Sequence, residues 1–334
     1  MHSHTSFIHR WLLSRKKQAS SSGFTLLELL ISLIVASMVV SGLLYMVVEL
    51  TKIDKREATV DQVQSDMKRA MDYITDDLQE AVYVYTDPTQ VTAELIADSA
   101  YPTGAVPVLA FWRIDPLESL PSCNTGTDEF KRLCNILHIR QSAYTLVVYF
   151  QKADGANSNR NWPGQSRIIR YELSRYTSES IKKLEERPGY RDPASTTDKD
   201  ASFEKWKAKG TPTGFSAVLV DFVQSPTVLL EREPLAINAD DSCSNYGTDD
   251  VDGSPLYTVV PQNASFSTNT SFFACVRNPD PDNDAETSNR ANQDIYVFLR
   301  GSTQGAGIRS FSDESSLPIL ETQVLVKGII DKNI

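Results

Sequence analysis

Gly23-Phe24-Thr25-Leu26-Leu27-Glu28-Leu29-Leu30 opens an apolar run that continues to Val48 and decides how this chain is organised. Glu28 is the only charged residue in that run. An acidic residue at the centre of a membrane helix costs about 2.5–3.5 kcal/mol on insertion scales, so Glu28 needs a partner. A lone membrane anchor offers none. A stack of identical helices offers the amino group that cleavage before Phe24 would create on a neighbouring chain.

The run is also long enough to cross a membrane. As a helix, the 25 residues of Phe24–Val48 extend over about 37 Å at roughly 1.5 Å per residue. Residues 1–23 hold four basic residues and no acidic one, and positive charge before an apolar run keeps that end in the cytoplasm. A secretory signal would be cut after its apolar stretch, which is usually shorter than this one. We expect a single-pass inner-membrane protein whose C-terminal part lies in the periplasm.

Gly23 to Leu30 resembles the class III signal sequence of type IV pilins and of the pseudopilins of type II-like secretion systems. The resemblance implies a leader at residues 1–23, cleaved by a prepilin peptidase after Gly23. It also implies methylation of the new terminus, Phe24, and a role for Glu28 in assembling a helical filament. The alternative is an uncut signal anchor whose flanking residues match this pattern by chance.

Removal of the leader changes the charge of the chain. The full sequence has 33 basic and 43 acidic residues, a formal net charge of −10. Without the leader it has 311 residues, with 29 basic against 43 acidic residues and a net charge of −14. This balance disfavours nucleic acid and anionic membrane surfaces as partners. It suits an exported domain.

The cysteines all lie beyond the apolar run, at Cys123, Cys134, Cys243 and Cys275. An even count in an exported region indicates disulfides. Among the three possible connectivities we favour Cys123–Cys134 and Cys243–Cys275, because each pair brackets a loop-rich stretch. A zinc site is the rival interpretation, but the sequence has no Cys-x-x-Cys motif.

Helical periodicity continues after the apolar run. Polar residues fill the other faces of this stretch, and Asp87-Pro88 is expected to end the helix. Apolar residues recur at three- and four-residue spacing: Val60, Val63, Met67, Ala70, Met71, Ile74, Leu78 and Val82. We therefore predict a transmembrane or filament-core helix over 24–50, which continues as an amphipathic helix over 51–86.

Residues 87–334 have the pattern of a β-rich head with long loops. Strands are predicted at Val106–Ile114, Tyr144–Lys152, Arg167–Tyr176, Ala217–Gln224, Phe266–Val276, Asp294–Arg300 and Gln323–Ile330. Residues 178–214 are interpreted as a surface insertion with a short helix at Ser180–Glu186. The fold class is α+β: a long N-terminal helix packed on an antiparallel β-sheet head, similar to that of pilins.

The residues give little support for an enzyme. His138 is the only histidine beyond the leader, and its apolar surroundings, Asn135–Arg140, resemble a strand more than a catalytic loop. No nucleophile elbow is present. No cofactor is expected except, as one alternative, calcium. Acidic side chains at Asp280, Asp282, Asp284 and Glu286 offer hard oxygen ligands, although their spacing is not that of an EF-hand. A solvated acidic turn is the other interpretation.

The resemblance also bears on the type of subunit. Many major pilins have prolines in this helix where Tyr45 and Ser65 stand here. That difference and the length of the chain favour a minor pilin or pseudopilin. Residues 69–78 are similar to J-type or W-type minor subunits, and the large head is similar to cyanobacterial pseudopilins for hormogonium polysaccharide secretion.

Two functional hypotheses follow from these resemblances. In the first, the chain is a pseudopilin that supports export, including export of polysaccharide. Other pilin-like subunits, an inner-membrane platform and its ATPase are then its partners. In the second, it is a minor pilin whose head is an adhesin on a surface pilus.

Overall fold

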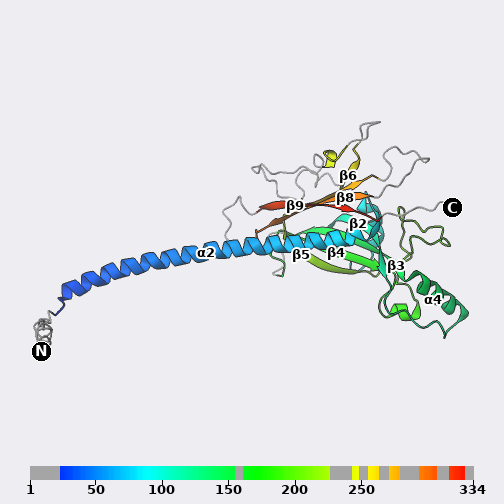
Figure 1. Cartoon of the computed structure of the whole chain (residues 1–334), viewed down its shortest axis with the longest axis horizontal. Helices are drawn as coiled ribbons and strands as arrows, with labels where there is room; N and C mark the ends of the chain where they lie inside the picture. Colours follow the sequence, from blue (N-terminus) through cyan, green and yellow to red (C-terminus); the bar gives the residue numbers. More distant parts are fainter. Residues whose placement is uncertain are drawn as a thin grey trace, which may run out of the picture. The chain divides into compact units, whose positions relative to one another are not determined.

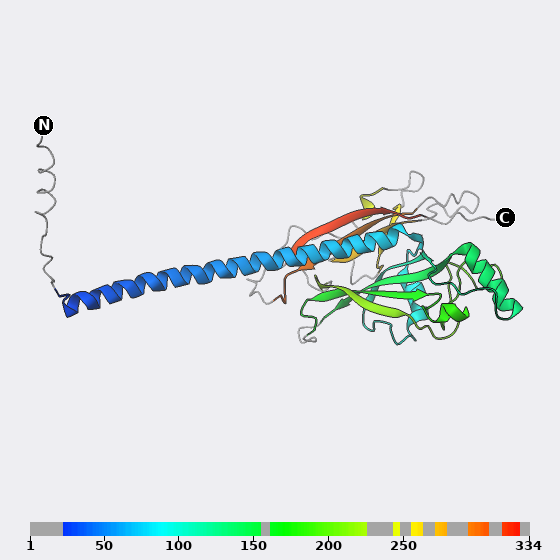
Figure 2. The same cartoon turned by 60° about the horizontal axis from the view of Figure 1, so that its bottom comes forward.

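The computed structural model describes residues 23–154, 161–225, 243–247, 255–262, 271–278, 293–306 and 316–327. The chain divides into two compact units, Met1–Glu57 and Ala58–Ile334. Each unit is treated by itself below. Figures 1 and 2 show the elements from two directions.

In the first unit, the described residues belong mainly to helix α2, whose full extent is Leu26–Gln79. No proline occurs anywhere in this helix. Every described side chain of the first unit is exposed, including the apolar ones from Phe24 to Ile53. The helix is long and apolar enough in this half to cross a membrane, judged by length and composition.

In the second unit, α2 becomes amphipathic, as its sequence periodicity predicts. One face is buried and the opposite face is exposed. The buried residues are Val63, Met67, Ala70, Met71, Ile74, Asp77 and Leu78. The apolar members of this face pack into a core with strands from the whole sheet.

The predicted helix over 51–86 is wrong at its C-terminal end. Helix α2 ends at Gln79, and strand β1 occupies Ala81–Val84. Strand β1 pairs antiparallel with β2 (Val106–Pro116), and Val84 lies opposite Phe111. Val82 therefore leaves the helix stripe and joins a different hydrophobic cluster. Branched and aromatic residues after Gln79 favour the extended pairing over another turn of helix. Asp87 caps the short helix α3 (Pro88–Thr92), which is followed by a 3₁₀ turn at Ala93–Leu95.

The sheet is antiparallel throughout. Its strand order is β1-β2-β3-β4-β5-β8-β7-β6, and β9 also pairs with β8. The remaining strands are β3 (Ser142–Ala153), β4 (Ser166–Ser174), β5 (Phe215–Val223), β6 (Tyr257–Val260), β7 (Phe272–Arg277), β8 (Asp294–Ser302) and β9 (Ser316–Leu325). The α+β class predicted from the sequence is confirmed.

The sheet curls around the buried face of α2 (Figure 2). Strand β5 meets β8 through a single residue pair, Val223 and Gly301. On the other side, the Lys327 amide donates to the Ala81 carbonyl at 3.1 Å. The Gln293 side chain also bonds both the amide and the carbonyl of Val84. These contacts join β1 to the residue before β8 and to a residue after β9, so strands distant in sequence enclose one face of α2.

Residues 178–214 do more than form the predicted surface insertion, because they cover the outer face of strands β1–β4. Tyr190 and Trp206 are 1% and 3% exposed and pack with Trp112 in a second hydrophobic cluster. The Trp206 indole donates to the Arg191 carbonyl at 2.9 Å, so the buried ring is also hydrogen-bonded. The interpretation as a purely surface insertion is wrong. The predicted short helix there is a 3₁₀ turn at Ser180–Lys183.

Other differences concern short apolar segments. The stretch around His138 was expected as a strand but lies in helix α4 (Asp128–Arg140), capped by Thr127. Strand β9 begins at Ser316, well before the expected Gln323. Strands β1 and β6 were not predicted, because four-residue runs carry too little periodicity. The other predicted strands overlap with β2, β3, β4, β5, β7 and β8. For the strand predicted at Phe266–Val276, β7 begins at Phe272, and residues 266–270 lie outside the described part of the chain.

Candidate assembly site

The first turn of α2 is hydrogen-bonded to Thr25. The backbone carbonyl of Thr25 accepts from the Leu29 amide at 3.2 Å, and its Oγ1 accepts from the Glu28 amide at 3.3 Å. Thr25 is therefore the N-cap, and Glu28 is the third helical residue. Thr-x-x-Glu has the composition of a capping box, a local signal from which the start of this helix could have been predicted.

The Gly23–Phe24 peptide bond precedes the helix. Residues 23–25 have no regular secondary structure, and Phe24 is 76% exposed. A Cβ added at Gly23 would meet no atom within 4 Å. The Gly23–Phe24 peptide bond therefore lies outside the regular turns of α2. The preceding leader residues, 1–22, lie outside the described part of the chain.

Glu28 lies in the exposed first turn of α2, where the helix dipole favours negative charge. Its carbonyl accepts from the Ser32 hydroxyl at 2.7 Å. Among the residues that the structure describes, none forms an ion pair with the Glu28 carboxylate. The carboxylate is thus presented outward from an apolar helix.

The residues around Glu28 form a continuous apolar surface. Leu26, Leu27, Leu29 and Leu30 are between 56% and 90% exposed. Further along the helix the exposed large apolar residues are Ile31, Leu33, Ile34, Val35, Met38, Val39, Val40, Leu43, Leu44, Tyr45, Met46, Val47, Val48, Leu50 and Ile53. A surface of this extent on a helix requires lipid or other helices around it.

A second carboxylate of α2, Asp77, is enclosed by the head. Its Oδ2 accepts from Arg170 Nε at 2.7 Å and from the Tyr149 hydroxyl at 2.6 Å, and Arg113 pairs with Oδ1. Burial and the negative charge of Asp77 raise the pKa of Tyr149 well above its ordinary value. Burial lowers the pKa of Arg170, but the hydrogen bond and charge of Asp77 more than offset this, so that pKa is raised. The cluster was not predicted from the sequence, because its members come from α2, β2, β3 and β4.

Both favoured disulfides are confirmed. Cys123 is bonded to Cys134 of α4, with Cα atoms 5.5 Å apart. Cys243 is bonded to Cys275 of β7, with Cα atoms 5.4 Å apart. Because the sulfur atoms of Cys123 and Cys134 are joined, they cannot act with nearby His138 as thiolate ligands for zinc. His138 Nε2 lies 2.9 Å from the Pro121 carbonyl oxygen.

The acidic side chains suggested for calcium, Asp280, Asp282, Asp284 and Glu286, lie outside the described residues. Calcium binding there stays a prediction.

Comparison with known proteins supports the interpretation of the N-terminus. The family model described as the prokaryotic N-terminal methylation motif matches residues 18–44. The comparisons with curated proteins and with solved structures found no match. The matched residues include Gly23, Phe24, Thr25 and Glu28, whose geometry is given above. The chain therefore carries, at the start of helix α2, the N-terminal methylation motif that is typical of type IV pilin-like proteins.

Proposed function

We propose that this chain is a minor pilin-like subunit, or pseudopilin, of a filament that supports export. Prepilin peptidase cuts it after Gly23, Phe24 is N-methylated, and the mature helix bundles with those of related subunits. The observation that carries the proposal is the position of Glu28, one turn into an exposed apolar helix that begins just after the cleavage site. The role is structural, and the chain itself performs no chemistry.

The expected partner of Glu28 follows from the position of its carboxylate in the first turn of the apolar helix. The carboxylate lies in the first turn of α2, and a mature chain would begin with a charged amine four residues earlier. Within one chain, the helix separates these groups along its axis by about 6 Å at 1.5 Å per residue. A neighbouring chain displaced along the filament axis can place its amine beside Glu28, which offsets the cost of burying either charge.

Charge and disulfides support the orientation. The basic residues Arg10, Arg15, Lys16 and Lys17 precede the apolar helix, which favours a cytoplasmic N-terminus. Both disulfides lie in the second unit, as expected for a head in the oxidising periplasm. An inner-membrane platform driven by a cytoplasmic ATPase would then extract the subunit from the membrane into the filament.

The minor role is supported by the size of the head and by Tyr45 and Ser65, where many major pilins have prolines. The exported material belongs to the same proposal, and polysaccharide is the cargo that the resemblance of the head favours. Deletion of the gene tests this part. Loss of the exported product with pili intact supports it, whereas loss of attachment with export intact supports an adhesive minor pilin.

Mass spectrometry of the N-terminal peptide tests the processing. Protein from membranes of normal cells should begin with N-methylated Phe24, and protein from cells lacking the peptidase should retain the leader. A Gly23→Val variant should also stay uncut. A Cβ at this position meets no atom of the described chain within 4 Å, so we expect the block to arise in the peptidase site. Ser22→Ala is the matched control. An intact Met1 end in every sample would overturn the proposal.

A further inference from the structure

Strand β5 has an open edge. On one side it pairs with β4 in regular register from Phe215, opposite Glu172, to Val218, opposite Ile169. On the other side, its only strand partner in the described part of the chain is at Val223. Among the described residues, no strand pairs with the backbone groups of Phe215–Val220 that point away from β4. An exposed edge of this kind is usually paired, covered or protected by charge.

The sequence of this edge does not discourage pairing. Phe215–Val220 contains no charged residue and no proline, and its branched and aromatic side chains favour extended structure. Phe215 is 57% exposed at the start of the strand. The first charge on the strand is Asp221, after the shift in register.

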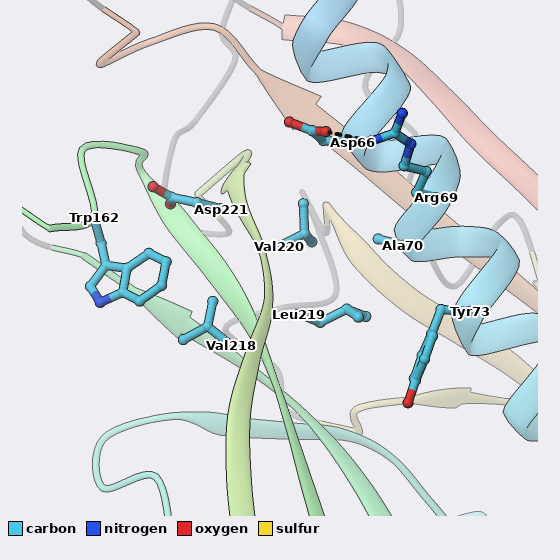
Figure 3. Close-up of a pocket in the computed structure, with 9 residues that line it drawn as sticks. All are labelled: Asp66, Arg69, Ala70, Tyr73, Trp162, Val218, Leu219, Val220 and Asp221. Carbon is cyan, nitrogen blue, oxygen red and sulfur yellow. Dashed lines mark ion pairs between the residues drawn. The ribbon is translucent and has the colours of Figure 1, made fainter.

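A groove runs beside this edge. It has a volume of about 380 Å³, and one wall is the outer flank of α2, with Asp66, Arg69, Ala70 and Tyr73. Figure 3 shows Leu219 pointing toward α2 and Val218 pointing toward Trp162. Apolar side chains thus project to both sides of the strand.

The walls of the groove carry residue types that dominate binding energies at protein interfaces. Tyr73 is 46% exposed, and the Arg170 guanidinium lies over its ring at 5.6 Å. Trp162 is held in the same way by Arg167, at 5.3 Å. These cation–π contacts orient both rings, and oriented aromatic residues are common anchors of interfaces.

We infer that β5 accepts an extended segment of an adjacent pilin-like subunit as an added strand, with side chains of that segment in the groove. This inference rests on the proposed function, because it needs a filament neighbour. The choice of occupant follows from continuity: the wall of the groove is the same helix, α2, that carries the apolar assembly surface. Main-chain hydrogen bonds would provide affinity, and alternate side chains would provide specificity.

The charges that line the groove indicate which residue types the added segment should contain. Asp66 and Asp221 line it together with a single cation, Arg69, which Asp66 pairs at 4.0 Å. The lining carboxylate without a cationic partner among these residues is Asp221, whose Oδ2 accepts from the Gly164 amide at 3.2 Å. A segment with apolar residues at alternate positions and a lysine or arginine facing Asp221 complements this lining.

Photo-crosslinking in cells of the source organism tests the inference. p-Benzoylphenylalanine is placed at Phe215 or at Tyr73, and as a control at Ile139, which is 83% exposed on α4. The position at the start of β5 (215) and the position in the groove (73) should both cross-link to one extended segment of a protein that itself carries the methylation motif. The yield should be at least tenfold above that of Ile139. Phe215→Ala should lower co-recovery of that neighbour about tenfold, while Ile139→Ala leaves it unchanged.

The same samples separate the two proposals. The N-terminus and the content of the sheared filament fraction are measured in every strain. If the chain is processed and assembled but both probe positions cross-link only to its own residues 226–242, or no better than Ile139, the strand-addition inference is overturned and the function stands. If the chain is neither processed nor assembled, both are overturned. A segment from a second copy of this chain supports the inference and identifies the neighbour.

Discussion

Two of the carboxylates on helix α2, Asp77 and Glu28, lie in opposite environments. Asp77, in the second unit, is 5% exposed and is held by Arg113, Arg170 and Tyr149. Glu28, in the first unit, is exposed and has no cationic partner among the described residues. The first carboxylate is satisfied by the fold of its own chain, whereas our proposal gives the second a partner on another chain. The difference separates a residue that stabilises the head from one suited to assembly.

The largest expected effect comes from Asp77→Ala. The change removes the carboxylate that two largely buried arginines share. Arg113 keeps Asp115 as a partner, and Arg170 keeps Glu172. The free energy of unfolding of the head should therefore fall by about 3 kcal/mol, the lower end of the range for breaking a buried ion pair. Urea denaturation of the detergent-solubilised chain, followed by tryptophan fluorescence, measures this. Asp76→Ala, at the exposed neighbouring position, is the control and should change stability by less than about 0.5 kcal/mol. Equal losses in the two variants would contradict a special role for Asp77.

Glu28→Ala should affect filament assembly rather than the stability of the head. Head stability should be unchanged, while incorporation into filaments falls by roughly a hundredfold, the equivalent of about 2.5–3.5 kcal/mol. Quantitative immunoblots of sheared filament and membrane fractions measure the change. Glu49→Ala is the matched control, because Glu49 is an exposed carboxylate of the same helix with its own partner, Lys52, at 3.3 Å. Normal incorporation of the Glu28→Ala variant into filaments would contradict a role for Glu28 in assembly.

Tyr149→Phe removes one hydrogen bond to the Asp77 carboxylate and leaves its ion pairs in place. Loss of a hydrogen bond to a charged group should cost about 1.5–3 kcal/mol at pH 7. The folded-state pKa of Tyr149 is raised above its ordinary value of 10.0. Its contribution is therefore fully present below pH 10.0 and is lost as the pH rises toward the folded-state pKa.

The wild-type chain should lose stability above pH 10 more steeply than Tyr149→Phe, by about 1.4 kcal/mol per pH unit. Denaturation curves at pH 9, 10 and 11 give both slopes. Parallel slopes would show that Tyr149 does not keep its proton to higher pH in the folded chain.

The smallest expected effect is that of Thr25→Ala. Loss of the cap should destabilise the first turn of α2 by about 1 kcal/mol. This would loosen the placement of Glu28 and lower filament incorporation by roughly fivefold, with no change in head stability. Thr25→Ser keeps the acceptor and should retain wild-type incorporation. An equal loss in both variants would assign the effect to peptidase recognition instead, which N-terminal mass spectrometry would reveal as uncut chain.

The features predicted correctly from the sequence are those whose signal is local. The motif around Gly23, the periodic stripe of α2 and the branched and aromatic runs of strands such as β3 each depend on residues close together in the chain. The wrong predictions arise where tertiary contacts override local preference. Val82 continues the apolar spacing of the helix, so the sequence predicts more helix there. Pairing with β2 and the branched and aromatic residues of Ala81–Val84 make this segment a strand instead. The Asn135–Arg140 stretch is apolar like a strand but completes a capped helix.

The candidate site divides in the same way. Gly23, Phe24 and Glu28 were identified from the sequence because processing and membrane insertion act on a nearly linear segment. Asp77 and the open edge of β5 were not identified. A buried ion pair and an unpaired strand edge are defined by which distant segments are absent or present beside them. No spacing in the sequence reports that Arg113 and Arg170 meet at one carboxylate.

The sequence by itself determined the cleavage motif, the apolar helix, the α+β class and a plausible pairing of the cysteines, because each depends on residue type and short-range spacing. Only the tertiary structure decided where α2 ends, that residues 178–214 cover a second core, that the sheet encloses Asp77, and that β5 meets β8 at one residue pair among the described residues. The physical reason is that burial and strand pairing are properties of surfaces brought together by folding. Their energies depend on partners far away in the chain.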